Sequence, residues 1–383
     1  MLSIDKLSYW EQKTFIKDID YLIIGAGIVG YSSALNLKKK DPKAKILILE
    51  QGYLPSGASS KNAGFACFGS ATELLDDIEQ FGESIVWETV ALRWSGLQQL
   101  RKEIGDENLD LQINGSWDLI TRAENERLNK VKTKIDYFNE KLEEITGESN
   151  IYSIDQEVGK KFSFNTIESS IYNRLEGQID TGKMNHAFYK KVIESGIHVI
   201  FAASAEEINE KESNVDVKTN IGIFNARKVL ICTNGFAKQF LPSDDISPAR
   251  AQVLITEPIN DLKIEGTFHY DCGYYYFRNI DNRILLGGGR NIDFKGETTT
   301  ELANTEQITN KLKELLNSII FPEKEVKVEH SWAGIMGVGT DKKPIIKAVS
   351  KSIYCGVRLG GMGVAIGCLV GKDLADLASI DQK

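Results

Sequence analysis

Cysteine and histidine are scarce in this sequence, and neither is spaced for metal binding. The 383 residues include five cysteines and four histidines. The cysteines form no C-x-x-C pair, and an odd number argues against a disulfide framework. The histidines, at positions 186, 198, 269 and 330, stand far apart, so we predict no metal site. We expect reduced, buried thiols, as in a cytoplasmic protein.

Positive charge and long hydrophobic runs are lacking as well. The net charge of −8 disfavours nucleic acid and anionic membrane surfaces as partners. No run approaches the roughly 18 apolar residues of a membrane-spanning helix, and residues 1–20 show no apolar segment of a signal peptide. We therefore predict no membrane insertion and a cytoplasmic location. Residues 364–370 are apolar but short and interrupted by glycine, which predicts a buried helix.

A glycine motif between two apolar strand patterns stands near the start. Residues 21–30 read YLIIGAGIVG, a helical pattern follows, and residues 45–50 read KILILE. Gly25, Gly27 and Gly30 suit a tight turn, close approach of the backbone to a pyrophosphate, and close helix–strand packing. The helix N-terminus attracts phosphates, and Glu50 suits a ribose diol. An ordinary βαβ unit explains one or two of these glycines, but not three together with the acid.

A second glycine run lies near the other end of the chain. Gly360–Gly363 follows an apolar strand pattern and precedes a helical one, and a further strand pattern ends at Thr233-Asn234-Gly235. A dinucleotide held along a long path needs several such loops. NAD alone would need one, whereas FAD would use more, because its isoalloxazine lies far from its adenine. We therefore expect FAD, and a simple turn is the alternative explanation of Gly360–Gly363.

Between these loops, helical and strand patterns are mixed. Helical patterns cover residues 73–104, 123–145, 184–194, 300–318 and 364–378. Strand patterns cover residues 116–121, 197–201, 215–219, 222–226, 228–232, 251–257, 273–278, 283–288, 326–332 and 352–357. A pure NAD dehydrogenase would alternate strand and helix through its first half. The mixture predicts a cofactor domain assembled from separated pieces of chain, with a substrate domain inserted.

Motifs in this order resemble those of a known family nearly end to end. The matches are Gly25–Gly30 with Glu50, residues 57–64, 179–183, 233–235, 250–253, 286–290 and 332–334, Asp341 with Pro344-Ile345, and Gly360–Gly363. The chain resembles the D-amino-acid-oxidase-like superfamily of FAD-dependent oxidoreductases, which includes glycine, sarcosine and γ-glutamylputrescine oxidases. The best match is the γ-glutamylputrescine-oxidase-like branch, which the Ser8-Tyr9-Trp10 lead-in supports.

The resemblance implies a mixed α/β fold, with a Rossmann-type FAD-binding domain and a substrate domain built on a large antiparallel sheet. We expect residues 1–75, 150–245 and 330–383 in the FAD-binding domain, and 76–149 and 246–329 in the substrate domain. The cofactor residues that it implies are Gly25, Gly27, Ile28, Val29, Gly30, Glu50, Gln51, Ser59, Lys61, Asn62, Ala63, Gly64, Ala205, Thr233, Gly235, Gly334, Met336, Arg358, Gly360, Gly361, Met362, Gly363 and Val364.

Three departures from the family pattern shape the expected chemistry. Covalently bound relatives attach FAD through a His or a Cys that residues 59–64 and 336–339 lack, so we expect non-covalent FAD. Amino-acid oxidases hold the substrate carboxylate with an Arg in Gly-Leu-Arg-Pro, but Gly334-Ile335-Met336-Gly337 stands here. The strand 284–287 lacks the Lys that promotes reaction with oxygen in some relatives, so oxygen, a quinone or an electron-transfer protein remains open as acceptor.

The missing Arg favours an amine, or a substrate whose charge lies further off. Arg290 and Arg358 are candidates to replace it, although a structural or flavin-facing role is the more frequent one for each. Tyr274 and Tyr276 share one face of an expected strand and Tyr275 the other. One face lines the substrate site or packs a sheet core. Tyr274, Tyr276 and Arg290 are thus the candidate catalytic residues, and His269 is a weaker one.

The expected function is oxidation of a C–N bond in a small amine or amino-acid derivative. Hydride would pass from the α-carbon to flavin N5, and the imine would hydrolyse in water. Such chemistry needs little acid–base machinery, which suits the lack of an obvious catalytic His or Cys. The alternatives are an FAD-dependent 2-hydroxy-acid dehydrogenase, and a non-catalytic FAD-holding subunit of a larger complex.

Overall fold

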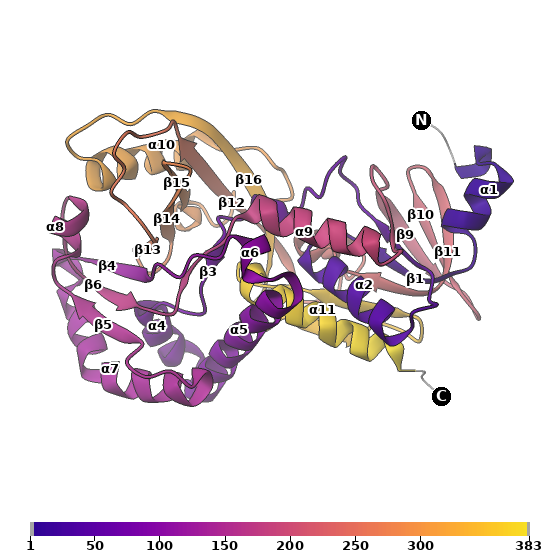
Figure 1. Cartoon of the computed structure of the whole chain (residues 1–383), viewed down its shortest axis with the longest axis horizontal. Coiled ribbons are helices and arrows are strands. Elements are labelled where there is room, and N and C mark those ends of the chain that lie inside the picture. Colours follow the sequence, from indigo (N-terminus) through magenta and orange to yellow (C-terminus); the bar gives the residue numbers. More distant parts are fainter. Residues whose placement is uncertain (1–3, 381–383) are drawn as a thin grey trace.

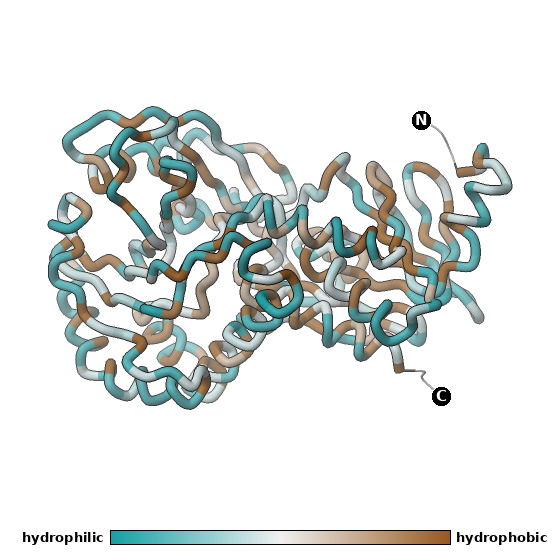
Figure 2. The backbone as a smooth tube through the Cα atoms, viewed as in Figure 1, coloured by the Kyte–Doolittle hydropathy of each residue, from teal (hydrophilic) through white to brown (hydrophobic). Residues whose placement is uncertain are grey.

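The chain folds into two halves that lie side by side, each built on a large sheet (Figure 1). The computed structural model describes residues 4–380. Both ends of the described chain lie in the half on the right of Figure 1, together with β1, α2 and α11. In Figure 2, hydrophobic stretches lie mainly inside each half, and hydrophilic ones follow the outer loops. Within residues 4–380, every helix is too short or too polar to cross a lipid bilayer.

One sheet of eight strands, counted over the described residues, carries the first glycine motif. Its main order is β17-β18-β11-β1-β2-β8, and β10 joins β11 to β9. The strands are β1 (Ile19–Ile24), β2 (Ile46–Leu49), β8 (His198–Ile200), β9 (Ala205–Glu210), β10 (Val215–Thr219), β11 (Gly222–Ile231), β17 (Ile345–Ala348) and β18 (Ile353–Val357). The strands β8, β2, β1, β11 and β18 run parallel. This is the predicted Rossmann-type arrangement, assembled from separated pieces of chain.

The second sheet is largely antiparallel, and β13–β4 is its parallel pair. Its order is β16-β12-β15-β14-β13-β4-β6-β5. The strands are β4 (Ser116–Thr121), β5 (Tyr152–Asp155), β6 (Ile167–Asn173), β12 (Ser247–Thr256), β13 (Thr267–Tyr270), β14 (Tyr275–Ile280), β15 (Arg283–Gly288) and β16 (Val328–Val338). A small third sheet pairs β3 (Phe65–Ala66) with β7 (Gly177–Gln178).

Sheet membership differs from the domain division expected from the sequence. We expected residues 150–245 and 330–383 in the FAD-binding domain. However, β5, β6 and most of β16 pair into the antiparallel sheet. The sequence patterns missed β5 and β6, and they placed β16 at residues 326–332, six residues short of its end. We therefore propose that β5, β6 and β16 belong to the substrate half.

Helices cover both sheets. The α-helices are α1 (Tyr9–Glu11), α2 (Ile28–Lys40), α3 (Ala58–Lys61), α4 (Ala71–Phe81), α5 (Glu83–Ile104), α6 (Asp106–Leu109), α7 (Asn125–Thr146), α8 (Val158–Phe162), α9 (Thr181–Glu194), α10 (Glu306–Leu315) and α11 (Gly363–Ser379). Short 3-10 segments are η1 (Ile4–Lys6), η3 (Arg122–Glu124), η4 (Asn234–Gln239) and η5 (Arg290–Ile292), and π-helical segments are η2 (Gln12–Ile16) and η6 (Leu316–Ile320).

Small residues let α2 and α11 pack closely. A Cβ on Gly371 would lie 2.6 Å from both the Cβ of Ser32 and the carbonyl oxygen of Val29. The hydroxyl of Ser32 donates to the carbonyl of Cys368 at 2.6 Å. Almost every α2 residue before its basic end is buried, as expected of a helix sandwiched between a sheet and another helix. This packing places the N-termini of both helices at one cavity.

Helix α5 joins the two halves. Val86 and Val90, near its start, belong to the hydrophobic core beneath α4 and α7. Leu97 and Leu100, near its end, belong to the core of α2, α9 and α11. Gly96 lies against the backbone of α11, because an added Cβ there would overlap the carbonyl of Ala365. One continuous helix therefore contributes to both cores and fixes the halves relative to each other.

Candidate functional site

A cavity of about 870 Å³ is lined by residues of both large sheets. One end is formed by the loops that follow β1, β2 and β11, together with α3 and the start of α11. The other end is formed by β12, β14, β16 and α4, with the loop after β15. Ligand pockets commonly occur where two domains meet. We call these ends the cofactor end and the substrate end.

The three glycines of the first motif form the turn between β1 and α2. Gly25 has φ +107°, and an added Cβ would lie 2.8 Å from the carbonyl oxygen of Cys232. Gly27 caps α2, and the N–H of Ile28 donates to the Ser59 hydroxyl at 2.9 Å. A Cβ on Gly30 would overlap the carbonyl oxygen of Gly25. The third glycine thus lets helix and strand touch, while the first two leave backbone open to the cavity.

Glu50 braces the loops around it. Its Oε2 accepts from the N–H of Ala26 at 3.0 Å, and its Oε1 accepts from the N–H of Gly52 at 2.9 Å and the hydroxyl of Ser56 at 3.2 Å. The residue is 5% exposed and lines the cavity. A carboxylate has about four lone-pair sites, so Glu50 retains acceptor capacity for a ribose diol. The sequence indicated the ribose contact but not this bracing role.

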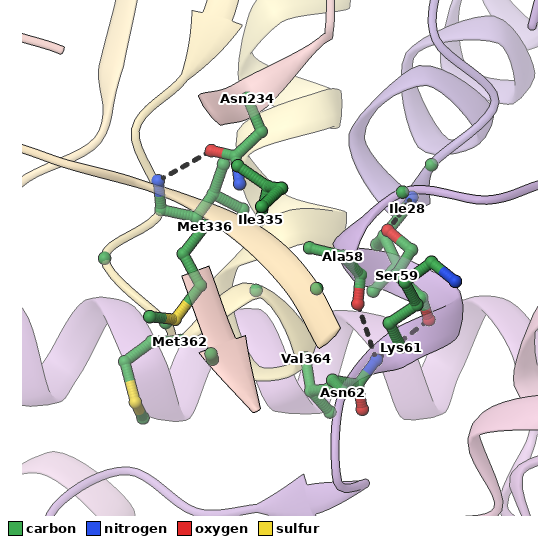
Figure 3. Close-up of a pocket in the computed structure, with 18 of the residues that line it drawn as sticks. Ile28, Ala58, Ser59, Lys61, Asn62, Asn234, Ile335, Met336, Met362 and Val364 are labelled. Atoms are coloured by element: carbon green, nitrogen blue, oxygen red, sulfur yellow. Dashed lines mark hydrogen bonds between the residues drawn. The ribbon is translucent and has the colours of Figure 1, made fainter. Parts of the chain in front are cut away.

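Asn62 follows α3 and stabilises the end of this helix and the turn after it. Its Nδ2 donates to the carbonyls of Ala58 and Ser59 at 3.2 and 2.8 Å, as Figure 3 shows. Its Oδ1 accepts from the N–H of Gly64 at 2.8 Å. Lys61, the last residue of α3, lines the cavity and forms no ion pair with any described residue. This cation is therefore available to a phosphate.

The second glycine run turns the chain into α11. Gly360 and Gly361 have φ of +58° and +83°, conformations that favour glycine. Asn234 fixes the loop, because its Oδ1 accepts from the N–H groups of Arg358 and Leu359 at 3.1 and 3.2 Å. In Figure 3, Val364 lies beside Asn62, whereas Met362 lies on the left of the view, below Met336. The first turn of a helix leaves N–H groups free for a ligand.

These features fit FAD. Two helix N-termini, an unpaired lysine and two glycine loops converge on the cofactor end. The hydroxyl of Thr233 is buried there without a hydrogen-bond partner among the described residues. Such an unsatisfied buried group calls for an explanation, and a bound ligand supplies one. The cavity also continues beyond the cofactor end, which leaves room for a substrate.

The structure brings the predicted site residues together with three exceptions. All the predicted cofactor residues line the cavity except Gly30, Gly235 and Arg358, and all three catalytic candidates line it. Gly30 contacts Gly25, and Gly235 contacts the carbonyl of Met336. Each therefore serves packing rather than ligand contact.

Arg358 requires the largest correction. Its Nη1 pairs with Asp245 and its Nη2 with Asp341, both at 2.7 Å. The guanidinium also donates to the carbonyl of Lys343. The side chain is thus occupied by protein groups and lies outside the cavity lining. We therefore discard Arg358 as a flavin contact and as a replacement for the missing carboxylate-binding arginine.

The tyrosine cluster divides as the alternation predicts. Tyr274 and Tyr276 line the cavity, whereas Tyr275 packs in the hydrophobic core behind the sheet. The Tyr276 ring meets Phe65 edge-on at 5.5 Å between centroids, and Phe65 meets His269 at 5.3 Å. These rings form an aromatic wall at the substrate end. Burial raises the pKa of Tyr276 to about 12, so its hydroxyl stays protonated.

Helix α4 supplies charged residues that the sequence did not reveal as part of the site. Lys342 pairs with Glu73 and Asp77 at 2.8 and 2.7 Å, and Arg93 also pairs with Glu73. Although burial opposes ionisation, the charges of Arg93 and Lys342 hold the pKa of Glu73 at about 2. The charges on this wall are therefore matched within the protein. The sequence shows that α4 has a polar face, but only the fold shows that this face is directed toward the cavity.

A buried polar cluster lies behind the aromatic wall. One ligand-type atom each from Cys67, Glu176 and His269 lies within 4.8 Å of the others. Burial raises the pKa of the Cys67 thiol and raises that of Glu176 to about 7, although Glu176 accepts from the N–H groups of Phe68 and Gly69. These raised pKa values disfavour the ionised thiol and carboxylate that a metal ion would need. We therefore assign no ion to the cluster, and the absence of a metal stays a prediction.

His269 is the other residue of this region that the sequence undervalued. Burial lowers its pKa to about 4, against the charge of Glu73. Its Nε2 is buried without a hydrogen-bond partner among the described residues, and the residue lines the cavity. The imidazole is thus neutral at pH 7. Only the fold brings it beside Phe65 and the cavity, because no motif surrounds it in the sequence.

Comparisons with known proteins agree with this arrangement. The family model of FAD-dependent oxidoreductases (DAO) matches residues 20–377. The chain is 24% identical to the probable oxidoreductase OrdL of Haemophilus influenzae, over 95% of this chain and 83% of that protein. It is 22% identical to the γ-glutamylputrescine oxidoreductase of Escherichia coli, over 94% and 83%. The crystal structure of glycine oxidase from Geobacillus kaustophilus superposes with a TM-score of 0.75 at 18% identity, covering 95% of each chain.

The match therefore spans both halves of the fold, from the strand before the first glycine motif to the end of the last helix. The cavity between the two halves has the glycine loops, the helix N-termini and the unsatisfied buried hydroxyl that suit a dinucleotide site. The chain belongs to the DAO family of FAD-dependent oxidoreductases.

Proposed function

We propose that the protein oxidises a C–N bond of a small amine or amino-acid derivative. The observation that carries this proposal is the continuity of the cavity. It extends from the dinucleotide loops to the substrate end, where Phe65, Tyr274 and Tyr276 line it. The names of two similar proteins, a γ-glutamylputrescine oxidoreductase and a glycine oxidase, support this substrate class. When bound, FAD supplies a hydride acceptor, its N5 atom, for hydrogen from the substrate α-carbon.

Backbone groups at the start of α11 would favour the reaction electrostatically. The loop Gly360–Gly363 and the first N–H groups of α11 face the cofactor end. Negative charge that develops during hydride transfer is stabilised by preorganised N–H donors and by a helix N-terminus. Asn234 holds this loop in place through its two backbone contacts. This part of the mechanism needs no ionisable side chain.

The substrate nitrogen must be neutral for hydride to leave the adjacent carbon. His269 lines the cavity, and its imidazole is neutral at pH 7. We expect it to accept a hydrogen bond from the neutral amine rather than to remove a proton outright, because a pKa of about 4 makes it a weak base. Tyr276 and Phe65 exclude water beside it. The resulting imine would hydrolyse in water.

Anaerobic spectroscopy tests the proposal. The FAD-loaded protein would be mixed with a panel of amines and amino acids without oxygen, and absorption near 450 nm, a general property of oxidised flavin, would be followed. Loss of the band with a C–N substrate supports the proposal. A panel in which only 2-hydroxy acids bleach the band would replace it by a hydroxy-acid dehydrogenase. A band that no compound bleaches would favour a non-catalytic FAD-holding subunit.

The electron acceptor and the compartment belong to the same proposal. Oxygen, a quinone or an electron-transfer protein each remain open, and adding each one to the bleached protein distinguishes them. The five cysteines are free, which agrees with a reducing, cytoplasmic location.

A further inference from the structure

Glu176 is a fully buried acid, and one of its oxygens has no partner among the described residues. It stands between β6 and β7 and is 0% exposed. Its Oε1 accepts from the N–H groups of Phe68 and Gly69 at 2.7 and 2.9 Å, whereas its Oε2 is buried and unsatisfied within residues 4–380. A buried polar atom of this kind requires an explanation, and a proton or a water molecule can supply it.

The buried polar cluster connects Glu176 to the cavity. Ligand-type atoms of Cys67, Glu176 and His269 lie within 4.8 Å of one another. Cys67 and His269 line the cavity, and Glu176 lies behind them, outside its lining. The Nε2 of His269 is also buried without a hydrogen-bond partner in the described chain. Polar atoms at this separation are suited to hydrogen bonding through one shared water molecule, so His269 bridges the cavity and Glu176.

The acids that line the cavity are engaged by other groups. The ion pairs are Glu73 and Asp77 with Lys342, Asp76 with Arg127, and Asp341 with Arg358. Glu50 binds backbone N–H groups at the cofactor end. An ion pair must break before such a carboxylate can take a proton, which is unfavourable where the pair is partly buried. Glu176 has no cation to release.

Burial raises the pKa of Glu176 to about 7, although two N–H groups oppose this effect. The titratable and charged groups around the cluster are Cys67 after β3, Glu73 on α4, Arg93 on α5, Asp118 on β4, Tyr152 on β5 and His269 on β13. Burial raises the pKa values of Cys67 and Tyr152, which keeps both protonated. Glu73 and Arg93 form an ion pair. Asp118, whose pKa burial raises to about 6, is the rival proton acceptor.

We propose that Glu176 receives, through His269, the proton that a substrate ammonium group must lose before oxidation. This inference rests on the proposed C–N oxidation, in which a neutral amine gives up hydride, and it names the group that takes the proton. With a pKa of about 4, His269 alone is too weak a base to keep it. Because Glu176 acts through His269, it is a positioning residue, and His269 is the group that touches the substrate.

The proton transfer conserves atoms and charge. One N–H bond of the ammonium group R–NH₃⁺ breaks, and its proton goes to one ring nitrogen of His269. The other ring nitrogen releases its proton through the shared water molecule to the Glu176 carboxylate, as an imidazole with two nitrogens allows. The products are the neutral amine R–NH₂, a neutral imidazole and a protonated carboxyl. No electron moves in this step, and the proton leaves by the same route after the product departs.

A non-oxidisable amine tests the transfer without turnover. Cumylamine has a ring that suits the aromatic wall, and its α-carbon bears no hydrogen, so hydride cannot leave it. Infrared difference spectra of the FAD-loaded protein would be recorded at pH 8, where most of Glu176 is ionised. We expect cumylamine binding to add the C=O band of a protonated carboxyl. Binding that adds no such band overturns the proposal.

Variants assign this band to one acid. It should be absent from Glu176→Gln, which keeps an oxygen for the N–H groups of Phe68 and Gly69. Asp118→Asn is the matched control, because it neutralises another buried acid on the same sheet, and it should leave the band in place. A band that persists in Glu176→Gln and disappears from Asp118→Asn would assign the proton to Asp118 and overturn the proposal.

The pH dependence of flavin bleaching is the second measurement. With an amine that bleaches the band, the anaerobic rate should rise as the pH passes about 7, where Glu176 ionises. Glu176→Gln should lower the rate at pH 8 about 100-fold, the lower end of what acid–base catalysis contributes. This loss should shrink toward about pH 10, where the amine arrives neutral, and Glu176→Asp should restore part of the rate. An equal loss at every pH would indicate a structural role and overturn the proposal.

The two measurements separate this inference from the proposed function. Protonation of Glu176 by cumylamine, together with a flavin band that no amine bleaches, would leave the proton acceptor standing and remove the C–N oxidation. Bleaching at the same rate in the unaltered protein and in Glu176→Gln would do the reverse. If cumylamine does not bind, the pH profile decides, and if Glu176→Gln does not fold, a flat profile in the unaltered protein overturns the proposal. A protein that neither binds cumylamine nor is bleached by any amine overturns both.

Discussion

The two ends of the cavity are built from different parts of the polypeptide. At the cofactor end the wall is mainly backbone, formed by Gly25, Gly27, Gly360 and Gly361 with the first turns of α2 and α11. At the substrate end the wall is mainly side chains, such as Tyr276 and Arg290. The backbone wall suits FAD, the cofactor of the family. A side-chain wall can change its chemistry without disturbing the loops.

This difference predicts how each end responds to substitution. Removing a glycine displaces backbone, and both the cofactor and the core behind it are affected. Replacing a side chain at the substrate end removes one contact, and the surrounding sheet persists. The following experiments test that contrast, from the largest expected effect to the smallest.

Gly30→Ala should cause the largest loss. The added Cβ would overlap the carbonyl oxygen of Gly25, and both residues are part of the turn that holds α2 against β1. We expect little bound FAD after purification, and a free energy of unfolding lower by about 3 kcal/mol or more, since overpacked cores lose 1–3 kcal/mol. The ratio of absorbance at 450 and 280 nm and urea denaturation measure the two effects.

Gly57→Ala serves as the control for stability. Gly57 has φ −78°, and an added Cβ would meet nothing within 4 Å. Its unfolding free energy should fall by no more than about 1 kcal/mol, the usual effect of alanine at a helix N-cap such as Gly57. If Gly30→Ala also retained normal FAD content, the cofactor end would not depend on its backbone packing.

Glu176→Gln should change how stability depends on pH. The pKa of Glu176 is raised by burial to about 7, so the folded state holds a proton that the unfolded state releases near pH 4.5. The folded protein therefore loses stability as the pH rises from about 4.5 to 7, by an amount of about 3 kcal/mol. The glutamine keeps an oxygen for the N–H groups of Phe68 and Gly69 and removes this loss.

Urea denaturation at pH 5 and pH 8 measures the change. The variant should be more stable than the original at pH 8 and similar to it at pH 5, with unchanged FAD content. Glu323→Gln, at an exposed position, is the control and should alter neither value. Equal pH dependence in the original and in Glu176→Gln would contradict the buried, protonated state of Glu176.

The contrast between the two ends also explains what the sequence could reveal. The glycine motifs and Glu50 are local, because a tight turn or a close backbone approach restricts the residue at that position. They predicted the FAD site and its Rossmann-type sheet. The alternation of Tyr274, Tyr275 and Tyr276 was local too, and it correctly separated the cavity face from the core face.

The substrate end was less predictable because its residues meet only in three dimensions. Glu73 lies on α4, His269 on β13 and Lys342 in the loop before β17, and no spacing in the sequence links them. The direction of the Arg358 side chain could not be predicted for the same reason. It stands beside a glycine run of the site, yet Asp245, which lies more than a hundred residues earlier, turns its side chain away from the cavity.

Tyr276→Phe should have the smallest effect of these substitutions. The Tyr276 ring packs over Gly287, its partner on the neighbouring strand, and a Cβ added to Gly287 would lie 2.5 Å from the ring. The ring is therefore fixed by packing that phenylalanine preserves. The hydroxyl makes no hydrogen bond to any described residue, so FAD content should be unchanged and unfolding free energy should change by less than about 1 kcal/mol.

Because Tyr276 lines the cavity, we expect its hydroxyl to contact a substrate. Its loss should weaken the binding of a polar ligand such as phenylacetamide about 3- to 10-fold, the range of one neutral hydrogen bond. Tyr275→Phe is the matched control, because the neighbouring tyrosine undergoes the same chemical change on the core face of the same strand. If both variants weakened phenylacetamide binding equally, the effect would come from the strand as a whole. The assignment of Tyr276 to the substrate wall would then be wrong, because a contact made by one side chain cannot be lost by altering the other face.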